Sequence, residues 1–296
     1  MEPPWTEDQI LGQYKFTNVY RASDRVSQYL IRNVIYKGDQ SPEEIFFRVL
    51  LFKLFNRIDT WRVLEGELDT IRHSEFDFVR YDRILSNALE RGQRLYSAAY
   101  IMPTAAQLGH SRKHRNHLML LARMMQDGVP SRVCQAKSMR PVYQTLISYP
   151  SIGRFLAYQF TIDLNYSVMT NFSEMDFVVP GPGALDGIRK CFASAGDLSE
   201  ESVIHFMADI QREEFDRSGL NFRDLWGRPL QLIDCQNLFC EVDKYARLAH
   251  PKIRGISGRT RIKHKFTPSS ECIDSWYPPK WGINASFSGR SSHIAF

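Results

Sequence analysis

The sequence of 296 residues lacks the common signatures of a metal site and of a disulfide framework. It has five cysteines, an odd number, and no Cys-x-x-Cys pair. This argues against a disulfide framework and against a four-cysteine zinc or iron–sulfur site. The eight histidines include no His-Glu-x-x-His pattern, and no Gly-x-x-x-x-Gly-Lys phosphate loop is present. We therefore expect neither a metal nor a cofactor.

Long apolar runs are also absent. No stretch approaches the roughly 20 apolar residues of a membrane span, and the start, Met1-Glu2-Pro3-Pro4-Trp5, has no basic-then-apolar signal pattern. The composition, 43% hydrophobic and 24% charged, is that of an ordinary soluble protein. We expect a cytoplasmic protein without a membrane partner, and nothing in the sequence indicates an obligate protein partner.

Period-2 alternation and internal repeats are scarce, and Tyr96–Met102 is the one candidate for a short strand. Helical patterns dominate, so the sequence predicts an all-α fold. Residues 1–250 are expected to form one helical domain, and residues 251–296 a loosely ordered basic and aromatic tail. The expected helices are Glu43–Phe55, Asp77–Ile84 continued by Asp82–Arg91, His117–Gln126, Ser199–Phe215 and Leu232–Ala249.

The net charge of +5 comes mostly from one segment. Six cations and no acid lie between Lys252 and Lys265, in a stretch rich in Gly and Ser. Such a segment is typical of a mobile arm that contacts phosphates, although a solubilising tail has the same composition. A second basic cluster precedes the apolar helix at 117–126. The expected DNA contacts from the two segments are Arg112, Lys113, Arg259, Arg261 and Lys263.

The opening segment, residues 16–30, is the most informative part of the chain. As one helix it would place Arg21, Asp24, Arg25 and Gln28 on one face. Val19, Val26, Leu30 and Val34 would form the opposite, buried face. The polar face is either a solvated surface with a local ion pair or a site for a planar or anionic partner, which arginines suit.

A helical hairpin is predicted at residues 146–159. A helix ends, a tight turn Pro150-Ser151-Ile152-Gly153 follows, and a new helix begins with Arg154. Backbone N–H groups at such a helix start can bind one phosphate without side-chain charge. The order Ile152-Gly153-x-Phe155-x-Ala157 resembles the helix-hairpin-helix motif of DNA repair glycosylases, although Ser151 replaces the usual first glycine. A plain helical hairpin is the alternative.

Three carboxylates attract attention near this hairpin and at the opening segment. Asp163 shares an apolar face with Gln159, and we interpret it as structural, paired with an arginine of the opening helix or capping a neighbouring element. Asp176 precedes Gly181-Pro182-Gly183, a turn that brings backbone close to another group. In the repair glycosylases a catalytic aspartate follows the hairpin glycine. Asp176 lies at a comparable distance after Gly153. When the chains are aligned on the apolar run, however, the Gly-Pro-Gly turn takes the place of the glycosylase aspartate. Asp24 is the alternative catalytic carboxylate.

Four motifs together carry a resemblance over residues 10–250. They are Phe-Thr-Asn-x-Tyr-Arg-x-x-Asp-Arg-Val at 16–26, Gly-x-Phe-Leu-Ala-Tyr-Gln at 153–159, Asp-Phe-Val-x-Pro-Gly-Pro-Gly-Ala at 176–184 and Cys-Glu-x-Asp-Lys-Tyr at 240–245. The chain resembles the alpha-glutamyl/putrescinyl thymine pyrophosphorylase family, related to the helical domain of hydroxymethyluracil DNA kinases. The resemblance implies a glycosylase-like helical fold that acts on hypermodified pyrimidines in duplex DNA. One bacterial branch resembles anti-phage DNA glycosylases.

Three functions follow as hypotheses. A monofunctional glycosylase would flip out a modified pyrimidine, such as glucosylated 5-hydroxymethylcytosine in phage DNA, and leave an abasic site. Asp24 or Asp176 would be its catalytic carboxylate. A transferase would instead replace pyrophosphate on 5-hydroxymethyluracil by an amino acid or polyamine, and a third possibility is a non-enzymatic DNA-binding module. The expected substrate contacts are Asn18, Tyr20, Arg21, Arg25, Gln28, Tyr158, Gln159, Gly181 and Gly183, and the expected hairpin contacts with DNA are Ser151, Gly153 and Arg154.

Overall fold

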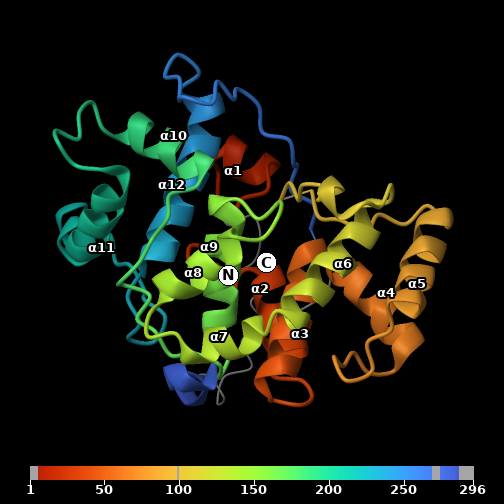
Figure 1. Ribbon diagram of the computed structural model, residues 1–296. Helices are drawn as coiled ribbons and strands as arrows, with labels where there is room; N and C mark the ends of the chain where they lie inside the picture. Colours follow the sequence, from red (N-terminus) through yellow and green to blue (C-terminus); the bar gives the residue numbers. More distant parts are fainter. Residues whose placement is uncertain (1–5, 99, 269–273, 287–296) are drawn as a thin grey trace. The chain divides into compact units, whose positions relative to one another are not determined.

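The computed structural model describes residues 6–98, 100–268 and 274–286. In these residues α-helices account for nearly all regular structure, and the only β pairing is two isolated bridges, Tyr14 with Lys265 and Leu225 with Arg228. The predicted all-α class is therefore confirmed (Figure 1). Residues 96–102, the candidate strand, form no β pairing where the structure describes them.

The described residues fall into two compact units. Unit 1 draws them from residues 1–25, 173–275 and 282–296, and unit 2 from residues 26–172 and 276–281. Residues 251–268 belong to unit 1, and residues 276–281 belong to unit 2. None of the described helices is long and apolar enough to cross a membrane.

Unit 2 is built around α3 (Pro42–Phe55), whose residues are buried on almost all sides. A helix that is apolar all round must be surrounded by others, and α6, α7 and α9 all pack on it. The unit begins in α2 (Arg25–Tyr29) and a π-helical turn (Leu30–Ile35). Its other helices are α4 (Ile58–Leu68), α5 (Phe78–Glu90), α6 (Lys113–Gln126), α7 (Val129–Gln135), α8 (Met139–Ile147) and α9 (Arg154–Asn165).

Unit 1 is centred on the long helix α12 (Leu232–Ala249), with the bounds expected from the sequence. α10 (Pro182–Cys191) and α11 (Glu200–Arg217) pack against it, and α10 lies beside it in Figure 1. Ser199 caps α11 by accepting a hydrogen bond from the N–H of Ser202 at 3.1 Å. The short α1 (Gln9–Gln13) and a 3₁₀ turn (Arg21–Ser23) also contact α12.

Two glycines explain why α10 and α12 come so close. A Cβ on Gly187 would lie 1.9 Å from the backbone oxygen of Phe239, and one on Gly183 would lie 3.0 Å from Cys240 Sγ. Any side chain at residue 187 would force the two backbones apart. The segment from Gly181 to Gly187 therefore brings backbone close to another group, as expected, and that group is α12.

Candidate functional site

The opening segment is not the continuous helix that its pattern predicts. The side chain of Asn18 accepts a hydrogen bond from the N–H of Tyr20 at 3.0 Å, which is an Asx turn that competes with helix formation. Tyr20 is extended, with φ −80° and ψ 118°, and Asp24 is extended at φ −64° and ψ 143°. A single 3₁₀ turn lies between them, and α2 starts only at Arg25. Arg21, Asp24, Arg25 and Gln28 consequently do not share one helical face.

Tyr20 connects this segment to the loop before α12. Its hydroxyl donates to the backbone oxygen of Arg228 at 2.7 Å and accepts from the N–H of Leu225 at 3.2 Å. Its ring stacks on Phe222 with 6.3 Å between the centroids. Burial raises the pKa of Tyr20 to about 12. Tyr20 therefore anchors the opening segment to this loop through its hydroxyl and its ring.

Asp234 is the most perturbed carboxyl group in unit 1. One of its oxygens accepts the N–H of Arg21 at 2.7 Å, and the other accepts the N–H of Gln231 at 2.9 Å, which caps α12. Burial raises the pKa of Asp234 to about 7, against the two N–H bonds that stabilise its charged form, and nearby Glu174 raises it further. Asp234 thus fixes the opening segment to the start of α12.

Glu174 and Arg228 complete a buried polar group that we name the Asp234 cluster: Tyr20, Arg21, Glu174, Arg228 and Asp234. Glu174 is paired with Arg228 at 3.3 Å and, like Arg21, is 4% exposed. The charge of Glu174 raises the pKa of Asp234, and the charge of Arg228 lowers it. Buried ionisable groups with shifted pKa values gather at functional sites more often than elsewhere, so this cluster is the candidate site in unit 1.

The two expected catalytic carboxylates have different surroundings. Asp24 ends the 3₁₀ turn that begins at Arg21 and is half-buried. Asp176 is exposed in the turn that follows Glu174. Arg25 and Asn18 are half-buried, whereas Arg21 is buried. Asp24 is therefore the carboxylate that lies in the same segment as the Asp234 cluster and retains partial access to solvent.

Three of the expected substrate contacts belong to unit 2. The side-chain oxygen of Gln28 accepts the N–H of Trp276 at 2.7 Å, and that of Gln159 accepts the hydroxyl of Tyr100 at 3.2 Å. Gln28 and Gln159 are each 1% exposed, and Tyr158 is fully buried. In the structure these side chains are packed in the interior of unit 2.

Asp163 has the structural role expected of it. It is fully buried and paired with Lys53 at 3.2 Å, and the ammonium group also donates to Asn56 at 2.8 Å. The same ammonium lies over the ring of Tyr100, 4.8 Å from its centroid. The cation in this pair is therefore a lysine of α3, and not the arginine of the opening helix that the sequence suggested.

The helical hairpin forms as expected between α8 and α9. Ser151 has φ +63°, the left-handed conformation that favours glycine, which explains why a glycine is usual there. Gly153 caps α9, and both Gly153 and Arg154 are exposed. A hollow of about 550 Å³ adjoins the turn and is lined by Arg123, Asp127, Arg132, Ser148, Tyr149 and Pro150. The backbone of the turn is thus accessible to a ligand, whereas DNA binding by the hairpin stays a prediction.

The basic segment at 252–265 has defined contacts instead of forming a free arm. The N–H and hydroxyl of Ser257 bond to Asp186 on α10, and Arg259 approaches the same carboxylate at 3.6 Å. The side chain of Arg247 donates to the backbone oxygen of Arg261 at 3.0 Å. Further along, Lys15 N–H bonds to the backbone oxygen of His264. The side chains of Arg259, Arg261 and Lys263 are nevertheless exposed.

The second basic cluster opens α6. Arg112 is paired with Glu90 at 3.6 Å, and Lys113 lies over the ring of Tyr96, 4.1 Å from its centroid. Burial lowers the pKa of Lys113. Both cations therefore have protein partners, and a role in DNA binding stays a prediction for each.

Sequence reasoning missed Glu174, Arg228 and Asp234. Asp234 has a local signal, because it lies three residues after Gln231 in a capping box at the start of a long helix. Its bond to Arg21 spans 213 positions in the sequence and has no local signal. Among the residues that the structure describes, no group of three His, Cys, Asp or Glu side chains is arranged to hold a metal ion.

Comparisons with known proteins agree with the resemblance to the kinase-associated helical domain. The family model described as "5-hmdU DNA kinase, helical domain" matches residues 1–255. A curated relative, the 5-hmdU DNA kinase of Bacillus phage SP10, is 28% identical over 262 residues, which are 82% of this chain and 40% of the relative. The chain thus spans well under half the length of that relative. No solved structure matches it significantly. The chain belongs to the family of the helical domain of 5-hmdU DNA kinases.

Proposed function

We propose that this chain binds duplex DNA and acts as an enzyme on a modified pyrimidine base. The observation that supports this is the family match, which includes all four motifs of the sequence and the Asp234 cluster. The printed name of the phage relative refers to 5-hmdU in DNA, a pyrimidine with a 5-hydroxymethyl group. A base inside the duplex must leave the stack before an enzyme can reach it, so we expect base flipping.

The first candidate reaction is monofunctional N-glycosylase chemistry, with Asp24 as the carboxylate. Asp24 would stabilise the positive charge that develops on the sugar and orient a water molecule for attack at C1′. The N-glycosidic bond breaks, the base leaves with a proton, and an abasic site remains. Asn18 and Arg25, which are half-buried in the same opening segment as Asp24, would read the base. Phe155 stands where strand-cutting members of the repair glycosylases carry a lysine, so no strand cleavage is expected.

The second candidate is a transferase, and the name of the kinase relative favours it. A phosphorylated or pyrophosphorylated hydroxymethyl group has a good leaving group. An amine would form a bond to the 5-methylene carbon, the bond from that carbon to the phosphate oxygen would break, and the anion would depart. Arg25 would hold the anion, since guanidinium groups suit phosphate. Arg21 would position the segment, because its side chain is buried.

One experiment tests both reactions. Duplexes that carry 5-hydroxymethyluracil, its phosphorylated and pyrophosphorylated forms, glucosylated 5-hydroxymethylcytosine or plain bases are incubated with the protein, with and without amino acids and polyamines. Mass spectrometry follows released bases and intact DNA. A released modified base with an abasic strand supports the glycosylase, and an amine adduct on intact DNA supports the transferase. If no duplex changes, the enzymatic proposal is wrong and a binding module remains.

Asp24→Asn and Asp176→Asn form a matched pair for the catalytic carboxylate. We expect Asp24→Asn to lower the rate by about 100-fold or more, within the range of lost acid–base or electrostatic catalysis. Asp176→Asn should stay close to the unchanged protein, because the Asp176 side chain is exposed in a turn. Unfolding temperatures of both variants control for folding. Loss of activity in Asp176→Asn alone would assign the role to Asp176 instead.

A further inference from the structure

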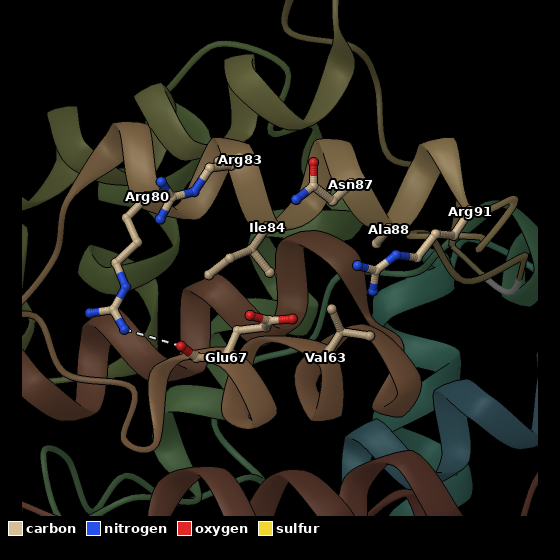
Figure 2. A pocket seen from close by; sticks show the side chains of 8 residues that line it. All are labelled: Val63, Glu67, Arg80, Arg83, Ile84, Asn87, Ala88 and Arg91. Carbon is tan, nitrogen blue, oxygen red and sulfur yellow. Dashed lines mark hydrogen bonds between the residues drawn. The ribbon is translucent and has the colours of Figure 1, made fainter.

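A pocket between α4 and α5 in unit 2 has three arginines among its eight lining residues. Its volume is about 120 Å³, and Figure 2 shows the side chains that line it. The stems of α5 side chains form one wall, and Val63 and Glu67 of α4 form the other. Arg80 donates to the backbone oxygen of Glu67 at 3.0 Å, which holds its guanidinium group against α4. The pocket lining is Val63, Glu67, Arg80, Arg83, Ile84, Asn87, Ala88 and Arg91.

The polar lining residues of α5 follow the helical repeat. Arg80, Arg83, Asn87 and Arg91 are spaced by three, four and four positions, so they lie along one face. At 1.5 Å per residue they extend over about 16 Å of the helix. All four are exposed. The face therefore presents a row of hydrogen-bond donors and not a single cation.

The two acids of α5 are paired with residues at the start of α6. Asp82 accepts hydrogen bonds from His114 at 2.8 Å and from Arg115 at 2.7 Å, and Glu90 is paired with Arg112 at 3.6 Å. Asp82 lies away from the arginine face, whereas Glu90 lies on the same side as Arg83 but is paired with Arg112. In the part of the chain that the structure describes, Arg83 and Arg91 have no carboxylate partner.

The acids of α4 are also engaged, with one exception. Asp59 is paired with Arg57 at 2.5 Å, and Glu65 with Lys37 at 3.0 Å. Glu67 is the carboxylate that remains in the pocket lining. Three guanidinium groups therefore face one carboxylate, and the pocket keeps an excess of positive charge at neutral pH.

We propose that this pocket, the α5 arginine pocket, binds a phosphate group. Guanidinium groups match phosphate oxygens in a bidentate geometry, and Asn87 adds a neutral donor. A volume of about 120 Å³ has room for one phosphate group. The phosphate comes either from the DNA backbone or from a small anion such as pyrophosphate. The DNA source rests on the proposed function, whereas phosphate binding itself does not.

The test measures binding of an unmodified duplex, so that failure of the base chemistry does not affect it. The variant is Arg83→Gln with Arg91→Gln, and the matched control is Arg72→Gln with Lys137→Gln, two exposed cations of unit 2 outside the pocket. Fluorescence anisotropy is recorded from 50 to 200 mM salt. Phosphate and pyrophosphate binding is measured by calorimetry on the same proteins, and unfolding temperatures confirm that each variant folds.

If the DNA backbone is the source, the pocket variant should bind the duplex about tenfold more weakly at 50 mM salt. Its dependence of log K on log salt should become shallower by about 1.8, or 0.9 for each lost contact. If a free anion is the source, pyrophosphate binding is lost and duplex binding is unchanged. Equal losses in the control pair, or no loss of either ligand in the pocket variant, would overturn the proposal.

Glu67→Gln should change ligand binding in the opposite direction to the arginine substitutions. Removing the single carboxylate of the lining should strengthen binding of the same ligand by about threefold to tenfold, because it removes a like-charge repulsion. Unchanged or weaker binding in Glu67→Gln would show that the ligand does not enter the pocket.

Discussion

Substitution of Gly187 by alanine should separate α10 from α12 and destabilise unit 1. The Cβ of alanine would lie 1.9 Å from the backbone oxygen of Phe239, whereas real Cβ contacts essentially never fall under 3.0 Å. The two helices must therefore move apart by about 1 Å, the difference between these distances. The obstacle is backbone, so no change of rotamer can relieve it.

The magnitude follows from two opposing effects. Overpacking of a close contact typically costs about 1–3 kcal/mol and sometimes more, and a gap of 1 Å also weakens the dispersion contacts along the interface. Alanine in place of glycine within a helix stabilises the folded state by about 1 kcal/mol. We expect a net loss of about 2 kcal/mol, at the upper end of this range, which would lower the unfolding temperature by roughly 4–8 °C.

The assay is chemical and thermal unfolding followed by circular dichroism, with Gly66→Ala in α4 as the matched control. Nothing lies within 4 Å of a Cβ on Gly66, so alanine there should stabilise by about 0.5–1 kcal/mol. The stability of Gly183→Ala should lie between those of Gly187→Ala and Gly66→Ala, because the atom nearest to the new Cβ is the side-chain sulfur of Cys240 at 3.0 Å. If Gly187→Ala is as stable as the unchanged protein, the close packing of α10 on α12 is wrong.

Two further predictions concern Asp234 and the hairpin. The pKa of Asp234 in the folded protein, about 7, exceeds its ordinary value of 3.8, so its contribution to stability is complete below pH 4 and is lost as the pH rises to 7. In Asp234→Asn the free energy of unfolding, measured with urea, should depend less on pH over this range, by up to about 1.4 kcal/mol for each pH unit. The same pH dependence in the variant and the unchanged protein would contradict the raised pKa of Asp234. Ser151→Gly should raise the free energy of unfolding by about 1 kcal/mol, because glycine adopts φ +63° without strain. An unchanged or lower value would mean that the turn does not require this conformation.

Local sequence signals predicted the helices that carry their own start and stop residues. Ser41-Pro42 before α3 and Ser199 before α11 give clear helix starts, and both helices form where expected. The hairpin turn at 148–153 likewise follows from its local residues. These elements depend on interactions within a few positions of the chain, which a sequence displays directly.

The opening segment shows where such reasoning fails. Its spacing of arginines and valines fits a helix, yet Asn18 and Asp234 hold the backbone of Tyr20 and Arg21 in other conformations. The first contact is a short polar side chain that competes with helix formation, and the second comes from a residue 213 positions away. A pattern of side chains cannot reveal a backbone hydrogen bond with a distant carboxylate.

The burial of the opening motif also changes the interpretation of its charged residues. Arg21 is 4% exposed and its N–H bonds to Asp234, while Tyr20 bonds to the loop at 225–228. A motif can be distinctive because its residues fix a buried junction, and not only because they contact a substrate. Loss of activity after substitution of Tyr20 or Arg21 would therefore not distinguish folding from chemistry. Asp24 and Arg25, which remain half-buried in the same segment, are the positions at which the two roles can be separated.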